Sequence, residues 1–378
     1  MPPSTDRLRL AKCSIYKITL NYIPAKTRYP KMPSIYEIDK NFKIETSINK
    51  DDIVFLNPLE EPFKVYGVYY EDGKYRRMPE AVAKTVSPGV HYLHSNTAGG
   101  RIRFRTNSPY VAINAKMPFI EKMSHFAMTG SVGFDLYVDG IYAHTYRPSF
   151  DIVDGYESVR DGLGDGMKEI VINMPLYSDV SEVYVGLKEG SDVEAPTPYK
   201  VEKPVVYYGS SVTQGGCASR AGTSYQGFVS RELDVNFINL GFSGNAYAEE
   251  PMYSYIKTLD MSVFVMDYDY NAVTVEYLDK THERMFLAIR EAQPELPIVL
   301  LTAPRAILSQ HYRDRLEIIR RTYNNALARG DRNVYLIKGP KLMEICGQDG
   351  TVDDCHPTDF GFYSMAKAIS EVLKTILF

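Results

Sequence analysis

The chain changes its hydrophobic rhythm close to Pro196, Pro198 and Pro204, and this change constrains the fold more than any other feature. Before the prolines, short alternating runs are separated by frequent turn signals. After them, apolar runs of strand length alternate with helical patterns. Regularly spaced short strands are typical of antiparallel sandwiches, and strand–helix alternation is typical of parallel sheets. We therefore predict a jelly-roll-like antiparallel β-sandwich over residues 42–200 and a flavodoxin-like, doubly wound α/β region over residues 201–378.

The second region has the clearer pattern. Five strands are expected, at residues 204–209, 235–240, 262–268, 297–302 and 333–337. Four helices are expected, at residues 223–233, 276–292, 312–329 and 360–376. Doubly wound sheets bind their ligands beyond the carboxyl ends of the strands. The loops that follow these strands are therefore the first place to look for a functional site.

The first region shows shorter runs, and its strands are expected at residues 64–69, 101–106, 111–115, 131–138, 169–172 and 182–187. In the second of these, Arg101, Arg103 and Arg105 alternate with apolar residues, which predicts an arginine face suited to solvent or to a hydroxyl-rich ligand, with solvent favoured. Residues 1–41 are rich in proline, lysine and tyrosine without sustained periodicity, so a poorly ordered extension is expected there.

Composition and charge exclude several classes of function. The net charge of −4 gives no reason to expect nucleic acid or an anionic membrane as a partner. No apolar run has the length of a membrane span, and the N-terminus lacks the apolar core of a signal peptide. The four cysteines show no Cys-x-x-Cys spacing, which favours reduced thiols over a zinc site or disulfides. These features predict a cytoplasmic protein and leave its oligomeric state open.

A serine and a late histidine provide the elements of acyl-transfer chemistry. Ser211 follows the apolar strand that ends at Gly209, and Asp353 and His356 form an Asp-x-x-His pattern before the last expected helix. A serine hydroxyl attacks only when a base accepts its proton, and that base needs an orienting carboxylate. We predict Ser211 as the nucleophile, His356 as the base and Asp353 as the orienter. Asp354 is the competing carboxylate, and a plain flexible turn is the alternative for the serine.

Other polar residues near the strand ends have weaker assignments. The glycine-containing loop at residues 239–245 and the side chain of Asn271 could supply hydrogen bonds to an oxyanion. Asp267 and Asp269 could bind a metal, but no third ligand lies near them in the sequence, so backbone capping is favoured and no metal or cofactor is expected. The remaining histidines considered are expected to be surface or packing residues: His91, His94, His282 and His311.

At this point the sequence resembles the SGNH, or GDSL-type, esterase/acylhydrolase superfamily. Four ordered blocks match, at Ser211, Gly244, Asn271 and the pair Asp353 and His356. The resemblance implies a serine esterase whose oxyanion hole is formed by Ser211, Gly244 and Asn271. The run Gly133-Phe134-Asp135-Leu136-Tyr137 further resembles the subgroup with a β-rich N-terminal Gly-x-Asp-Leu-Tyr domain.

Two positions depart from the superfamily pattern. The usual Gly-Asp-Ser is Gly209-Ser210-Ser211 here, so the contact made by the aspartate is lost or replaced. The usual Gly-x-Asn-Asp is replaced by Asp269-Tyr270-Asn271-Ala272, which puts the path of the Asn271 loop in question.

The resemblance and the short loops near Ser211 together predict the reaction. We expect removal of a short acyl group, acetyl above all, from a hydroxyl of a small-molecule or saccharide ester, through an acyl-enzyme. An acyltransferase, a lipase of the same fold and a non-catalytic glycan-binding protein are the alternatives.

Overall fold

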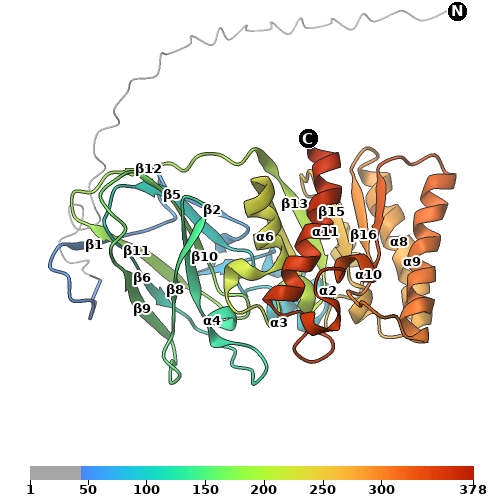
Figure 1. Cartoon of the computed structure of the whole chain (residues 1–378), viewed down its shortest axis with the longest axis horizontal. Coiled ribbons are helices and arrows are strands. Elements are labelled where there is room, and N and C mark those ends of the chain that lie inside the picture. The colour runs from blue at the N-terminus through green and yellow to red at the C-terminus, as the bar shows by residue number, and fades with distance from the viewer. Residues whose placement is uncertain (1–43) are drawn as a thin grey trace, which may run out of the picture. The chain divides into compact units, whose positions relative to one another are not determined.

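The structure, a computed structural model, describes residues 44–378, so the extension predicted for residues 1–41 lies outside the described residues. The first region is built from two antiparallel sheets (Figure 1). One sheet has the order β1-β11-β6-β9, with strands Ile53–Leu56, Glu182–Lys188, Val111–Lys116 and Gly155–Arg160. The other has the order β12-β5-β10-β7-β8, with strands Val193–Glu194, Arg101–Thr106, Lys168–Asn173, Phe134–Val138 and Ile141–Tyr146, and β2 (Lys64–Tyr66) also pairs with β5.

The two sheets share one apolar core. Phe104 and Ile172 from one sheet and Ile113 and Val185 from the other belong to the same buried cluster. Alternate residues of each strand point to the same face, so both sheets contribute every second side chain to this core. The predicted antiparallel β-rich region is therefore confirmed.

The main departures from the predicted first region are four strands that were not expected, β1, β8, β9 and β12, together with short helices and a broken strand. Gly67, at φ +76°, interrupts the strand expected at residues 64–69, and a small hairpin of β3 (Tyr69–Glu71) and β4 (Lys74–Arg76) follows. Three helices were not expected: α2 (Glu80–Val86), α3 (Pro88–Leu93) and α4 (Met128–Ser131). All three are too short for helical periodicity to stand out in the sequence.

The second region is a five-stranded parallel sheet with the order β14-β13-β15-β16-β17. Its strands are Val201–Gly209 (β13), Val235–Gly241 (β14), Val263–Asp267 (β15), Ile298–Leu301 (β16) and Val334–Ile337 (β17). The first strand in sequence lies between the second and the third, so the direction of winding reverses there. The carboxyl ends of strands at such a reversal are the usual position of a ligand site.

Helices cover both faces of this sheet, as a doubly wound fold requires. The longer helices are α6 (Tyr225–Leu233), α7 (Glu250–Ile256), α8 (Val275–Ala292), α9 (Gln310–Ala328) and α11 (Asp359–Leu377). Shorter turns are α5 (Ser211–Gln214), α10 (Gly339–Leu342), and the 3₁₀ helices Ala221–Thr223, Asp269–Asn271 and Gly347–Gly350. The predicted fold class is confirmed, although α7 was not expected. In the described part of the chain, no helix is both long and apolar enough to cross a membrane.

The two regions share buried surface. Helices α2 and α3 belong by sequence to the first region, yet Ala83 and Val90 are buried in the core on one face of the parallel sheet. Arg101 and Arg103 are 3% and 7% exposed, so the prediction that the arginine face is turned to solvent is wrong for these two residues, whereas the Arg105 side chain is 37% exposed. Arg101 instead donates to the Phe237 carbonyl of β14 at 3.1 Å. A guanidinium has enough donors to satisfy backbone carbonyls across such an interface, which the sequence pattern of a single strand cannot show.

Candidate active site

Ser211 lies where the parallel strands end. It follows β13 and is the first residue of α5, a single helical turn that ends at Gly215 in the left-handed conformation. The Ser210 hydroxyl accepts a hydrogen bond from the Val212 N–H at 3.2 Å and caps this turn. The second position of Gly209-Ser210-Ser211 therefore has a structural role of its own here, although it is not the usual aspartate.

One close backbone approach and one side-chain hydrogen bond hold the Ser211 turn against the sheet. A Cβ at Gly241 would lie 2.1 Å from the Gln214 nitrogen, so β14 can pass this closely only with glycine. The Thr213 hydroxyl donates to Asp267 at 2.8 Å, and the Tyr225 hydroxyl donates to the same carboxyl oxygen. Burial raises the pKa of Asp267 to about 7. The serine turn is thus tied to the ends of two neighbouring strands.

The loop before α11 positions His356 and Asp353. The Val352 N–H donates to the His356 carbonyl at 2.9 Å, which closes a tight turn around the intervening residues. Asp354 takes the left-handed conformation, with φ at +61°, and its carboxylate pairs with Arg305 at 2.8 Å. Asp354 therefore points to a partner other than the imidazole, and Asp353 remains beside the ring.

The structure brings Ser211, His356 and Asp353 into one hydrogen-bonded chain. Ser211 Oγ lies 2.9 Å from His356 Nε2, and His356 Nδ1 lies 2.7 Å from Asp353 Oδ2. The other carboxylate oxygen of Asp353 accepts from the His356 backbone N–H at 2.7 Å. Partial burial alone would raise the pKa of Asp353, but these hydrogen bonds outweigh it and lower that pKa below its ordinary value. An ionised Asp353 can accept from Nδ1–H and leaves Nε2 free to take the serine proton.

Gly244 and Asn271, the other two predicted site residues, lie in loops that touch each other. The Asn271 side-chain oxygen accepts from the Ala246 N–H at 3.2 Å, which ties the Asn271 loop to the segment that carries Gly244. Gly244 is exposed and has a φ of +67°, and no atom of the described residues lies within 4 Å of the position that a Cβ would take there. Within residues 44–378, no hydrogen bond uses the Gly244 N–H or Asn271 Nδ2. Both donors are therefore available to a bound group.

Asp269, which stands where the superfamily pattern has glycine, anchors the start of the Asn271 loop. Its carboxylate accepts from Arg315 Nε at 2.6 Å and from the Ala303 N–H at 2.7 Å. Both Asp269 and Arg315 are 3% exposed at the side chain, so the pair is buried with its hydrogen bonds satisfied. Asp269 thus caps backbone and pairs with an arginine, in agreement with the interpretation favoured over a metal site.

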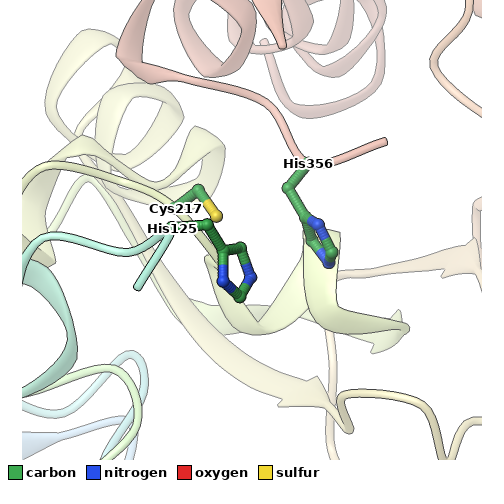
Figure 2. Close-up of side chains that lie close together, drawn as sticks. All are labelled: His125, Cys217 and His356. Atoms are coloured by element: carbon green, nitrogen blue, oxygen red, sulfur yellow. The ribbon is translucent and has the colours of Figure 1, made fainter. Parts of the chain in front are cut away.

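Two residues beside His356 were not selected from the sequence. His125 comes from the loop between β6 and α4, and its ring centroid lies 5.6 Å from that of His356. Cys217 follows the Ser211 turn, and burial raises the pKa of its thiol to about 12. Figure 2 shows both side chains next to the His356 ring. No local motif marks either residue, because they come from segments that only the fold brings together.

Asp135 of the Gly-x-Asp-Leu-Tyr run lies at the junction of the two regions. Its fully buried carboxylate accepts from the Gly222 N–H at 2.8 Å and from Asn173 Nδ2 at 2.7 Å. The ring of Tyr137 lies under Arg231, with the guanidinium 4.3 Å from its centroid. The motif therefore docks the sandwich onto the segment that leads from the Ser211 turn into α6.

The four histidines expected to be surface or packing residues lie away from the site. His282 is buried, stacks on Tyr268 with centroids 5.9 Å apart, and bonds to Thr322. His94 is buried beside Arg76, and His311 is exposed. His91 pairs with Glu80 at 3.2 Å.

The fold and the site together define the class of protein. A parallel sheet in this order, with a serine, a histidine and an aspartate in hydrogen-bonded sequence at its carboxyl edge, is the arrangement of an SGNH-type esterase. Residues 202–374 match the GDSL-like lipase/acylhydrolase family, and residues 53–193 match the N-terminus of SGNH-hydrolase-type esterases. The chain belongs to the SGNH (GDSL-type) superfamily, in the subgroup with the Gly-x-Asp-Leu-Tyr N-terminal domain, and is an esterase.

Solved structures support the same fold over both regions. A GDSL-like lipase from Bacteroides ovatus is 28% identical, with a TM-score of 0.77, and the match covers 86% of this chain and 98% of that chain. The salicylyl-acyltransferase SsfX3 from a tetracycline biosynthetic pathway is 20% identical, with a TM-score of 0.70 and coverage of 87% and 99%. The acetyl xylan esterase Est2A from Butyrivibrio proteoclasticus is 11% identical, with a TM-score of 0.55 and coverage of 85% and 98%. No curated protein matches the sequence significantly.

Proposed function

We propose that the protein hydrolyses esters through Ser211 and removes a short acyl group, acetyl above all, from a hydroxyl of a carbohydrate. The observation that carries the proposal is the hydrogen-bonded chain from Ser211 through His356 to Asp353. In the first step, Ser211 Oγ attacks the ester carbonyl as its proton passes to His356 Nε2. His356 then returns the proton to the leaving alcohol. Water repeats the sequence and releases the acid.

The negative charge that develops on the carbonyl oxygen needs preorganised donors. The Ser211 N–H is at the start of α5, where helical N–H groups lack intrahelical partners. We propose that it acts together with the Gly244 N–H and Asn271 Nδ2, which have no partner among residues 44–378. Removing one such donor typically costs about 10²- to 10³-fold in kcat. Asn271→Ala should therefore lose about that factor while KM changes little.

Two features support a short acyl group and a sugar hydroxyl. The residues around the proposed oxyanion site are small, namely Gly241, Ser243 and Gly244, so the walls beside the acyl group offer little apolar surface. The structural neighbours include an acetyl xylan esterase, and its similarity to this chain covers both the sandwich and the α/β region. The substrate of that protein is an analogy, and the site geometry is the physical basis of the proposal.

Turnover of p-nitrophenyl esters of increasing chain length, together with acetylated oligosaccharides, tests this proposal. We expect a graded decline from acetyl to butyryl, because one methylene is worth only about 1–3 kcal/mol, and poor activity with octanoyl. A fluorophosphonate probe should label wild type and Ser210→Ala but not Ser211→Ala. Rates that rise steadily toward palmitoyl, without activity on acetylated sugars, would instead indicate a lipase.

Acyl transfer to an alcohol other than water is the second proposal. The salicylyl-acyltransferase matches with a TM-score of 0.70, against 0.55 for the acetyl xylan esterase. Val273, Ile307 and Val352 are 65%, 75% and 47% exposed on the loops after β15 and β16 and before α11, where an apolar acceptor could contact them. Adding candidate alcohols to an ester assay separates the two reactions. Transfer requires an acylated alcohol as product, whereas hydrolysis gives only the free acid.

A further inference from the structure

Three side chains that are good metal ligands meet at His356. The ligand atoms of His125, Cys217 and His356 all lie within 4.8 Å of one another. They come from the loop after β6, the turn after α5 and the loop before α11, and Figure 2 shows them gathered around one small space. The proposed ester hydrolysis uses only His356. His125 and Cys217 therefore have no assigned role, although they lie beside the proposed base.

The ligand types favour a borderline or soft divalent cation. Zn²⁺ binds imidazole nitrogen at about 2.0–2.1 Å and thiolate sulfur at about 2.3 Å, so ligand atoms around one tetrahedral ion lie about 3.3–3.8 Å apart. The separations here, up to 4.8 Å, exceed this by about 1 Å. His125 is exposed in a loop, and a side-chain rotation there can close that gap. Hard cations such as Mg²⁺ and Ca²⁺ prefer oxygen and are not suited to this set.

The orientation of the His356 ring determines which nitrogen would bind the ion. Nδ1 is 2.7 Å from the Asp353 carboxylate, which leaves Nε2 as the free ligand atom. A metal-bound histidine almost always donates its other ring N–H to such an acceptor, so Asp353 already occupies the supporting position. The same Nε2 lies 2.9 Å from Ser211 Oγ. A metal ion on Nε2 and a proton from Ser211 are therefore mutually exclusive.

We propose that His125, Cys217 and His356 form a Zn²⁺ site and that the bound ion inhibits the esterase by occupying the nitrogen that must accept the Ser211 proton. On binding, the Cys217 thiol releases its proton to solvent and the thiolate coordinates the ion. The fourth position stays open to water. The inhibitory part of this proposal rests on the proposed function, whereas the binding part does not.

Binding is tested without reference to turnover. Co²⁺ serves as a spectroscopic probe, because a bound thiolate gives a charge-transfer band in the near ultraviolet. The Ser211→Ala protein, which keeps all three ligands, should develop this band with one equivalent of Co²⁺. Adding Cys217→Ser should abolish the band and adding His125→Gln should weaken it, while the buried Cys346→Ser, outside the cluster, should leave it intact. Absence of the band, or its loss in Cys355→Ser but not in Cys217→Ser, would overturn the site.

Inhibition is tested by titrating free Zn²⁺ into an ester assay, with each variant normalised to its own rate in chelator. Wild type should be inhibited reversibly, and EDTA should restore the rate. Cys217→Ser and His125→Gln should each raise the half-inhibiting concentration at least about tenfold, since even a supporting partner of a metal ligand is worth 10- to 100-fold in affinity. Equal inhibition in all variants, or activation by Zn²⁺, would reject the inhibitory role. A cobalt band in a protein without esterase activity would reject only the proposed function.

Discussion

The two regions contribute to the site in different ways. The α/β region places Ser211, Asn271 and the His356 loop directly after its strands or before its last helix, so the groups proposed to react stand at one edge of one sheet. The sandwich contributes His125, which lies in a loop beside His356, and Asp135, which lies within a strand and binds the Gly222 N–H of the α/β region. In the α/β region, the order of the strands in the sheet determines where the site side chains lie. In the sandwich, the position of such a side chain depends on which part of its surface the α/β region covers.

This contrast makes specific predictions, and the largest effect should come from the α/β region. Ser211→Ala should lower kcat by about 10⁴- to 10⁶-fold, because the nucleophile is removed and only binding and oxyanion contacts remain. His125→Ala, measured with the same acetyl ester in the presence of a chelator, should lose less than the ~100-fold that a proton-transfer role is worth. Comparable losses in both variants would mean that the sandwich takes part in the chemistry.

The second prediction concerns the choice between two neighbouring carboxylates. Asp353→Asn should lower kcat by up to about 10⁴-fold, because an amide can favour the wrong tautomer of His356. Asp354→Asn changes a carboxylate that is 72% exposed and pairs with Arg305, so its effect should be only a few-fold. Steady-state rates of the two variants measure this directly. The reverse order of effects would shift the orienting residue by one position.

The third prediction concerns Asp135 of the sandwich, whose substitution should lower the stability of the fold. Asp135→Asn replaces one carboxylate oxygen with a donor, although both oxygens accept hydrogen bonds from buried groups. The free energy of unfolding should fall by about 1–3 kcal/mol, the cost of leaving such a group unsatisfied. Chemical denaturation measures this free energy for Asp135→Asn and for the control Asp165→Asn. Asp165 is an exposed aspartate of the same region, and its substitution should leave the free energy of unfolding nearly unchanged. An unchanged midpoint for Asp135→Asn would show that the two regions do not depend on this contact.

The last effect expected is a difference in acid sensitivity between the two cores, which disappears at neutral pH. Burial lowers the pKa of His282 to about 3, below the value of about 6.5 for a histidine in an unfolded chain. As pH falls through that interval the unfolded state takes up the proton first, so stability decreases by at most about 1.4 kcal/mol per pH unit. His282→Gln should flatten the decline of the unfolding free energy between neutral pH and pH ~4.5. The sandwich residue His144 is only half-buried, and His144→Gln should flatten it less.

The sequence predicted the α/β region almost element by element, because each strand and long helix has its own hydrophobic period. The helix expected at 276–292 is Val275–Ala292, and the one expected at 360–376 is Asp359–Leu377. Helix α7, at Glu250–Ile256, was missed because it is short and begins with a proline in its first turn. In the sandwich, the central strands β5, β6, β7, β10 and β11 were predicted, but β1, β8, β9 and β12 were missed. Helices α2 and α3 were also missed, since their apolar residues become core only against the other region.

The candidate site shows the same limit. Ser211, Asp353 and His356 could be proposed from the sequence because each lies in a recognisable local pattern at a strand end or before a helix, and the structure places them within hydrogen-bonding distance of one another. His125 and Cys217 lie outside any such pattern, and their proximity depends on three segments from two regions. The prediction that the arginines of β5 face solvent failed for a related reason. A single strand shows that its polar residues share a face, but it does not show what packs against that face.

Helices α2 and α3 also bear on how proteins of this type can diversify. They lie upstream of the proline-rich junction in the chain, yet α2 packs on α7 beyond it. If recombination at that junction separated the two regions, the α/β region would lose α2, and the apolar residues Met252 and Ile256 of α7 would become exposed. We therefore expect this β-rich region to be retained together with the esterase region whose apolar surface it covers.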